Sequence, residues 1–188
     1  METKNIKTII KDSIPSLVES LEQLKNNVNL QTLGEPIIIK NKKELEAFKH
    51  EDSKLNHLQN KCNIIYLIKV ENKNNYSNIV EEFFKFKNKK EFNTCREKNG
   101  NNWVNCNEKY LYVGSCKENI KSRLMQHFGF KSKSTYALHL NEWWDFERFG
   151  GIEIIINEVL YLNNDALQVC EDILWDYYKP ILGKQGKK

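Results

Sequence analysis

Two polar side chains in the middle of the chain have chemistry that suits a phosphate ester. Arg123 and His127 are four residues apart, which places both side chains on one face of a helix, about one turn from each other. A guanidinium binds phosphate oxygens through paired N–H groups, and an imidazole accepts or orients a proton near neutral pH. The pair therefore indicates a phosphodiester as ligand, although the same spacing also occurs on ordinary solvated helices.

A third candidate is a carboxylate in an apolar stretch. Glu171 has Leu167, Leu174 and Trp175 as its neighbours at helical spacing. A carboxylate among apolar side chains is costly unless a cation meets it. The sequence leaves two cations open. One is a divalent metal such as Mg²⁺, which keeps much of its water and needs few protein carboxylates, and the other is Arg123 in a structural salt bridge.

Short strands and helices must position these side chains. Strands are predicted where β-branched and aromatic residues dominate, at residues 63–70, at 109–113 with Gly114 as the end, and at 151–160. Helices are predicted at 120–128 after the cap Asn119, at 135–149 before Gly150-Gly151, and from Asp165 until shortly before Pro180. This order predicts an α/β domain, with a small sheet covered by helices.

The chain divides into two predicted parts. Residues 1–60 read as a helical N-terminal segment, with one helix after Ser13, an extended piece at 36–39 and a second helix from the capping box Asn41–Glu44 to about Leu58. Residues 61–188 form the main domain. It contains a polar insertion at about 71–108 with one helical patch, and we expect this insertion to contribute little core.

Two strand tyrosines, Tyr66 and Tyr112, complete a set whose order is informative. The chain resembles the GIY-YIG nuclease family over about residues 62–183. The motifs that carry the resemblance are, in order, Asn63-Ile64-Ile65-Tyr66, Tyr112-Val113-Gly114, Arg123 with His127, and Glu171 before Lys179-Pro180. The resemblance implies a small three-stranded mixed or antiparallel sheet flanked by helices.

The resemblance also implies roles for these residues. Tyr66, Tyr112, Arg123, His127 and Glu171 would be catalytic, with Glu171 as the ligand of Mg²⁺ or Mn²⁺ and Arg123 holding the phosphate. Either Tyr66 or His127 would activate the water, and the sequence does not decide between them. Tyr112 would position the other groups.

The chain departs from the family pattern in three places. Ile64 stands where the first motif has glycine, and the insertion at 71–108 is longer than the usual linker, as in restriction-enzyme members. The asparagine that often follows the last helix is missing, and Gln185 is its candidate substitute. Altered phosphate positioning or weaker activity would follow from that loss.

The composition limits the kinds of partner and the cellular location that are expected for the protein. The formal net charge of +4 permits a nucleic acid, and Lys85, Lys87, Lys89 and Lys90 cluster in the insertion as candidate DNA contacts. No apolar run is long enough for a membrane span, and five cysteines without a Cys-x-x-Cys pair indicate reduced thiols and a cytoplasmic protein.

The sequence as a whole predicts a Mg²⁺-dependent DNA endonuclease of restriction or phage-defence type, with RNA not excluded as substrate. A subunit with one site needs a second copy to cut both strands, so a homodimer is expected, at least on DNA. The alternatives are a catalytically inactive nucleic-acid-binding module of the same fold, a structure-specific repair nuclease, and a structural α/β protein with an Arg123–Glu171 pair.

Overall fold

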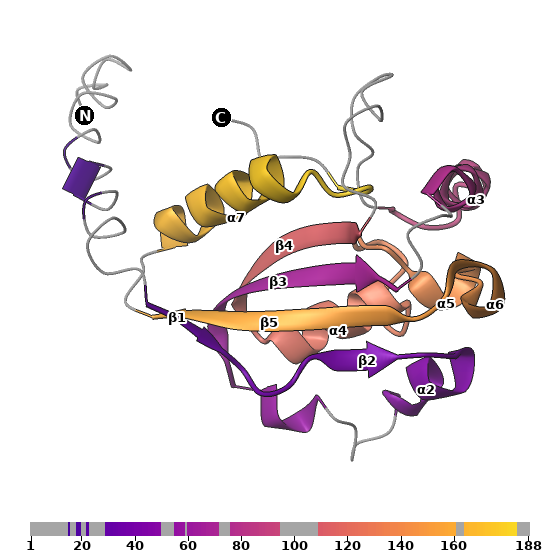
Figure 1. Ribbon diagram of the computed structural model, residues 1–188, viewed down its shortest axis with the longest axis horizontal. Coiled ribbons are helices and arrows are strands. Elements are labelled where there is room, and N and C mark those ends of the chain that lie inside the picture. Colours follow the sequence, from indigo (N-terminus) through magenta and orange to yellow (C-terminus); the bar gives the residue numbers. More distant parts are fainter. Residues whose placement is uncertain are drawn as a thin grey trace, which may run out of the picture.

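The described strands form one antiparallel sheet, and they come from widely separated parts of the sequence (Figure 1). The computed structural model describes residues 15, 18–19, 22, 29–49, 55–58, 60–71, 76–94, 109–160 and 164–183. The strands are β1 (Asn29–Thr32), β2 (Ile37–Ile39), β3 (Cys62–Val70), β4 (Tyr110–Glu118) and β5 (Ile152–Leu160). Their spatial order is β1, β5, β3, β4, and β2 also pairs with β5, so β4 lies at an edge of the sheet.

The sheet is larger than the sequence predicts. β3, β4 and β5 confirm the three predicted strands, but two more strands join them, and the prediction of three is wrong. β1 and β2 lie within the segment predicted as a helical appendage. In β2, Ile37 and Ile39 are buried whereas Ile38 is 53% exposed, an alternation typical of a strand with one face on the core. The N-terminal segment therefore supplies part of the sheet.

Helices cover both faces of this sheet (Figure 1). They are α2 (Lys42–Ala47), α3 (Tyr76–Asn88), α4 (Ile120–Phe128), α5 (Leu140–Trp143), α6 (Phe146–Phe149) and α7 (Asn164–Tyr178), with a 3₁₀ turn η1 at Asn56–Leu58. α7 packs on one face, where Leu167 meets Ile65 of β3. Tyr66, the next residue of β3, points to the other face, into the main core that α4 shares. No helix in the described part of the chain has the length and apolar character that crossing a membrane requires.

The helices that carry the candidate residues lie where the sequence predicts them. α4 begins after Asn119, whose side chain accepts a hydrogen bond of 2.9 Å from the Ser122 amide. α7 begins at Asn164 and ends at Tyr178, two residues before Pro180. Both candidate-bearing helices are therefore confirmed, and they lie on opposite faces of the sheet.

Other helix predictions are partly wrong. α2 begins after the predicted cap Asn41, whose Oδ1 accepts from the Glu44 amide at 2.9 Å, but it ends at Ala47, well before residue 58. The helix predicted at 135–149 is replaced by α5 and α6, because Asp145 caps a new helix, accepting from the Glu147 amide at 3.0 Å. The helix expected after Ser13 lies outside the described residues, apart from residues 15, 18–19 and 22.

The insertion contributes more core than its composition suggests. α3 buries Ile79, Phe83 and Phe86, which recur at helical spacing, and the Phe83 ring lies 5.3 Å from that of Trp143. The expectation of little core is therefore wrong for this helix. Residues 95–108 lie outside the described residues.

Candidate active site

The two motif tyrosines lie side by side on adjacent strands. Tyr66 of β3 pairs with Gly114 of β4, and Ile68 pairs with Tyr112, so both phenols lie on the same face of the sheet. The centroids of the two rings are 6.2 Å apart, and the ring planes are inclined by 24°. Tyr66 is fully buried, whereas Tyr112 is partly buried.

Gly114 makes room for these rings. β4 continues through Gly114 to Glu118, so the prediction that this glycine ends the strand is wrong. A Cβ atom at this position would lie 2.5 Å from the Tyr66 hydroxyl oxygen and 2.6 Å from Cε1 of Tyr112. Glycine is therefore needed at this position, because the two tyrosine rings occupy the space that a side chain would fill.

Replacing Gly114 with Ala is expected to destabilise the fold by about 1–3 kcal/mol, since the added methyl group would push on the fully buried Tyr66, whose hydroxyl is held by Arg123 and His127. Urea unfolding of the variant and of wild type measures the difference. Lys117→Ala in the same strand is the matched control, because Lys117 is exposed and a surface change of this kind stays within about 0.5 kcal/mol. Equal stability of Gly114→Ala and wild type would mean that the rings shift without cost.

Arg123 of α4 reaches the Tyr66 phenol from the helix. Its Nε donates to the Tyr66 hydroxyl oxygen at 3.3 Å, and its Nη1 donates to Oε1 of Gln126 at 2.9 Å and to the Tyr136 carbonyl at 3.2 Å. Burial lowers the pKa of Arg123, but the Tyr66 and Tyr112 phenols raise it more strongly, so the guanidinium remains charged. Its orientation is fixed by partners on three different elements.

His127 donates to the same phenol oxygen. The Leu138 amide donates to Nδ1 of His127 at 3.2 Å, so Nδ1 is the acceptor nitrogen and a neutral ring carries its proton on Nε2. Nε2 lies 2.8 Å from the Tyr66 hydroxyl oxygen and therefore donates to it. Burial, with the charge of Arg123 and the ring of His139, holds the pKa of His127 well below its ordinary value. His127 is thus a neutral donor whose two nitrogens are both engaged.

This geometry bears on the open choice of general base. His127 is fully buried and has no nitrogen left to accept a proton from water. The Tyr66 oxygen accepts two hydrogen bonds, which favour the phenolate form. Burial nevertheless raises the pKa of Tyr66 well above its ordinary value, and Tyr112 and Glu171 add to this, whereas Arg123 opposes it. Tyr66 is therefore a phenol in the free protein.

Glu171 approaches the edge strand from the opposite face of the sheet. The Ser115 hydroxyl of β4 donates to Oε2 of this carboxylate. Burial raises the pKa of Glu171, and the hydrogen bond from Ser115 and the charge of Arg123 offset only part of that rise. Arg123 and Glu171 form no ion pair in the described part of the chain, so the structural alternative of a direct Arg123–Glu171 bridge is not what is observed.

The donors near Glu171 suit one class of metal ion. Among the described residues no group of three or more His, Cys, Asp and Glu side chains gathers in one place, so the closed ligand sets of structural zinc are absent there. A single carboxylate oriented by a Ser115 hydroxyl fits Mg²⁺ or Mn²⁺, which take most of their remaining ligands from water and substrate oxygens.

The described structure thus brings Tyr66, Tyr112, Arg123 and His127 together on one face of the sheet, whereas Glu171 reaches the edge strand β4 from the other face through Ser115. Glu171 still lies near enough to influence the pKa of Tyr66. Sequence reasoning missed Ser115, Gln126 and the Tyr136 carbonyl, which hold Glu171 and Arg123 in place. A signal for Ser115 existed, because strand alternation places it on the face opposite Tyr112 and Gly114, toward the helix that carries Glu171. The position of Gln185 lies outside the described residues.

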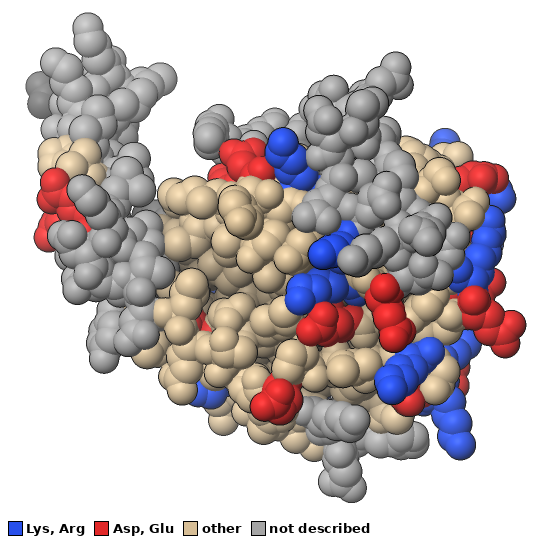
Figure 2. Space-filling model, in the orientation of Figure 1, with Lys and Arg blue, Asp and Glu red and all other residues tan. Residues whose placement is uncertain are grey.

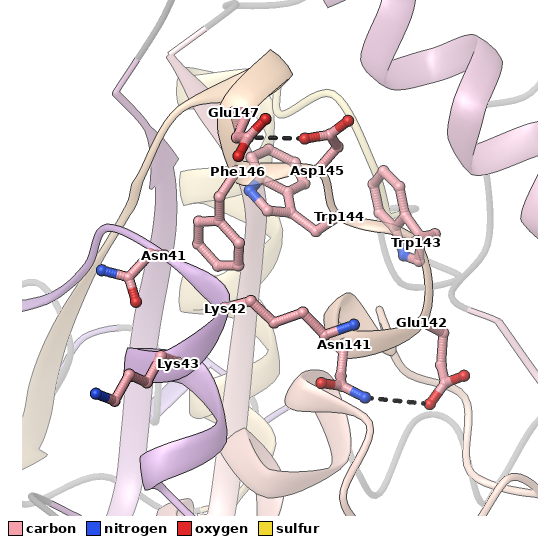
Figure 3. Close-up of a pocket in the computed structure, with 10 residues that line it drawn as sticks. All are labelled: Asn41, Lys42, Lys43, Asn141, Glu142, Trp143, Trp144, Asp145, Phe146 and Glu147. Carbon is pink, nitrogen blue, oxygen red and sulfur yellow. Dashed lines mark hydrogen bonds between the residues drawn. The ribbon is translucent and has the colours of Figure 1, made fainter.

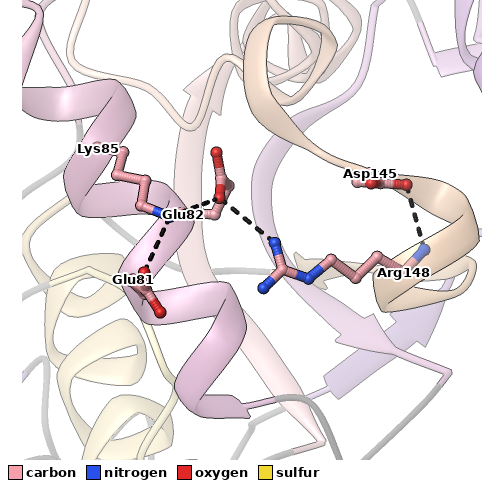
Figure 4. Close-up of polar contacts among 5 residues, drawn as sticks. All are labelled: Glu81, Glu82, Lys85, Asp145 and Arg148. Carbon is pink, nitrogen blue, oxygen red and sulfur yellow. Dashed lines mark hydrogen bonds and ion pairs between the residues drawn. The ribbon is translucent and has the colours of Figure 1, made fainter.

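The insertion lysines stand in a mixed-charge environment. Nζ of Lys85 lies 2.9 Å from a Glu81 oxygen and 3.5 Å from a Glu82 oxygen, and Arg148 of α6 also reaches Glu82 at 3.5 Å (Figure 4). Figure 2 shows Lys and Arg beside Asp and Glu over the end of the molecule where α3, α5 and α6 lie. Lys89 and Lys90 are exposed beyond the helix end. Part of the predicted positive charge is therefore neutralised within the protein.

A groove of about 720 Å³ lies away from the five site residues (Figure 3). Lys42 and Lys43 of α2 line one side, and the segment with Trp143, Trp144 and Phe146 lines the other, together with the carboxylates of Glu142, Asp145 and Glu147 (Figure 3). Its lining has both signs of charge and contains none of the predicted catalytic residues.

Comparison of the chain with protein families, with curated proteins and with solved structures finds no match, so the resemblance to GIY-YIG nucleases rests on the sequence motifs alone.

Proposed function

We propose that this protein is a Mg²⁺- or Mn²⁺-dependent endonuclease that hydrolyses phosphodiester bonds in DNA. One observation carries the proposal: a charged guanidinium and a neutral imidazole converge on one phenol oxygen, with Arg123 Nε at 3.3 Å and His127 Nε2 at 2.8 Å from Tyr66. A buried phenol in a packing role needs one hydrogen-bond partner, not two donors. The arrangement instead suits an oxygen that must carry negative charge for part of a reaction.

The roles in this proposal follow from the contacts. Tyr66 would act as the base only in its phenolate form, so its own proton would first leave to solvent. The hydrogen bonds from Arg123 and His127 would stabilise this phenolate, which would then take the proton of the attacking water and become a phenol again. The guanidinium of Arg123 would bind the nonbridging phosphate oxygens. His127 is a positioning residue, because its ring touches Tyr66 and the Leu138 backbone amide.

Glu171 would hold the metal ion, with its carboxylate oriented by Ser115. When bound, such an ion supplies positive charge that stabilises the phosphate and the leaving oxygen and lowers the pKa of nearby acids. We therefore expect catalysis to depend strongly on the metal ion, because the pKa of Tyr66 is raised and its phenol is protonated in the free protein.

A catalytically inactive nucleic-acid-binding module is the second candidate. The complete burial of Tyr66 and its raised pKa favour it, as does the absence of the family's glycine at Ile64. Incubation of the purified protein with plasmid DNA and with RNA, each with Mg²⁺, Mn²⁺ or EDTA, separates the two. We expect nicked or linear plasmid with metal and intact plasmid with EDTA. Tight binding without cleavage under every metal condition would leave only the binding module.

The proposal extends to the biological setting of the nuclease. A compact chain with one candidate site suits a restriction or phage-defence nuclease that acts as a homodimer on DNA. Sedimentation of the protein with a cleavable duplex tests this, since a complex with one subunit that cuts both strands would contradict the dimer.

Neutralising Lys85, Lys87, Lys89 and Lys90 together, as Lys→Gln, is expected to weaken DNA binding and to lower its salt dependence. Each lost phosphate contact reduces the slope of log affinity against log salt by roughly one unit. Lys85 should contribute least, because Glu81 and Glu82 offset its charge. DNA affinity measured over a salt series shows whether these lysines contact DNA, with Lys42→Gln/Lys43→Gln on α2 as the control variant. Equal slopes for wild type and the fourfold variant would exclude α3 as a DNA contact.

A further inference from the structure

The segment from Asn119 to Asn141, which comprises α4 and the loop after it, is basic and borders the candidate site. It contains four Lys and Arg residues, Arg123 among them, and no Asp or Glu. This contrasts with α3, where carboxylates accompany the lysines. A local excess of positive charge beside Arg123 attracts a polyanion such as a nucleic-acid strand.

Tyr136 lies in this segment, directly at the guanidinium. Its backbone carbonyl accepts the hydrogen bond of 3.2 Å from Nη1 of Arg123, whereas its side chain is 62% exposed. A large aromatic ring is thus presented to solvent next to the group that would bind the phosphate. Core packing does not explain this position, since it is the neighbouring Ala137 and Leu138 that are fully buried.

The residues around Tyr136 are held in place by the end of the insertion. The Asn93 amide donates to the Lys133 carbonyl at 2.8 Å, and the Asn93 side chain donates to the Ser134 carbonyl at 2.7 Å. The Ala137 amide donates back to the Asn93 carbonyl at 3.2 Å. The loop is therefore anchored on both sides of Tyr136, so that its ring is presented from an ordered backbone, which limits the entropy lost on binding.

We propose that the Tyr136 side chain stacks on a nucleobase next to the phosphate held by Arg123. This inference rests on the proposed nuclease function and assigns that site a base-contacting residue. Every base offers a π-face, so stacking on an aromatic ring needs no particular sequence, and it strengthens binding by on the order of 10-fold per base. The base must be single-stranded or turned out of its duplex, because a base inside a duplex has both faces covered by stacking on its neighbours.

The test compares Tyr136→Ala, Tyr136→Phe and Tyr136→Trp with wild type. All four proteins keep the backbone carbonyl that binds Arg123, so the variants change the exposed ring alone. The probe is a single-stranded oligonucleotide containing 2-aminopurine, titrated in EDTA to prevent cleavage, with anisotropy for affinity and base fluorescence for stacking. Tyr177→Ala is the matched control, because Tyr177 is 77% exposed on α7.

We expect Tyr136→Ala to weaken binding by about 10-fold and to lose the quenching of 2-aminopurine, while Phe and Trp restore both. Unchanged affinity and quenching in the Ala variant would overturn the inference. Failure of Phe to restore them would also overturn it, because a hydroxyl contact would then be responsible. If wild type cleaves plasmid but the Ala variant matches it in every assay, the stacking role alone fails. If wild type binds no nucleic acid, the proposed function fails with it.

Discussion

Glu171→Gln is expected to abolish cleavage while leaving nucleic-acid binding nearly unchanged. The amide keeps the shape of the carboxylate and still accepts the hydrogen bond from Ser115, but it lacks the negative charge that the proposed divalent cation would need. Loss of the charge stabilisation that the metal provides should lower the single-turnover rate by at least about 10³-fold. Cleavage across a Mg²⁺ titration and binding in EDTA measure the two effects separately.

The same variant should be at least as stable as wild type at neutral pH. Burial raises the pKa of Glu171 in the folded protein, so wild type loses stability as the pH rises and the carboxylate ionises. In acid, where Glu171 is protonated in both the folded and the unfolded protein, this loss of stability disappears. Glu153→Gln is the matched control, because Glu153 is a half-buried carboxylate that pairs with Lys69 at 3.2 Å. Full Mg²⁺-dependent activity of Glu171→Gln would remove this residue from the metal site.

Arg123→Lys is expected to damage cleavage nearly as much as Arg123→Ala, by on the order of 10²–10³-fold. The guanidinium donates from Nε to Tyr66 and from Nη1 to Gln126 and Tyr136, and its planar shape is the one that the proposed phosphate contact requires. An ammonium group on a flexible stem cannot hold these partners at once. Single-turnover rates with saturating enzyme measure the loss without interference from weaker binding.

Arg148→Lys provides the comparison for this substitution, since Arg148 is a surface residue that pairs with Glu82 at 3.5 Å. It should cleave at the wild-type rate, because an exposed pair contributes little. An Arg123→Lys variant with near wild-type rate would show that the site needs only a positive charge there. In that case the hydrogen bond to Tyr66 would lose its proposed role.

The elements that carry the candidate residues could be predicted from the sequence, and the contacts between them could not. The strand at 62–70 and the helix at 120–128 have strong local patterns, so Tyr66 and Arg123 were placed correctly on their elements. The proton on His127 depends on a hydrogen bond from Leu138, in a segment predicted as helix that is an irregular loop. The periodicity of apolar residues in the sequence contains no information about a hydrogen bond between a loop amide and a side chain on a helix.

The two short strands near the N-terminus have a similar explanation. The sequence predicts an extended piece at 36–39, where β2 lies, but not that it joins the sheet, and it misses β1; four and three residues are too few for alternation to identify a strand of a sheet. Their stability comes from pairing with β5, more than a hundred residues later in the chain. The breaks around Asp145 were missed because the apolar residues of 135–149 fit a helical period, while the cap that divides them is a single side chain.

The position of β5 has a consequence for biosynthesis. This strand, the last one among the described residues, lies between β3 and the N-terminal strands β1 and β2, whose described pairings are with β5. While the chain emerges from the ribosome, Ile37 and Ile39 have no sheet partner until Ile154 and Ile152 are available, and one edge of β3 stays open. Nascent chains shorter than this expose aggregation-prone edges, and folding must wait for long-range pairing. Slow synthesis at low temperature, or a chaperone that covers β-strand edges, should therefore increase the yield of folded protein.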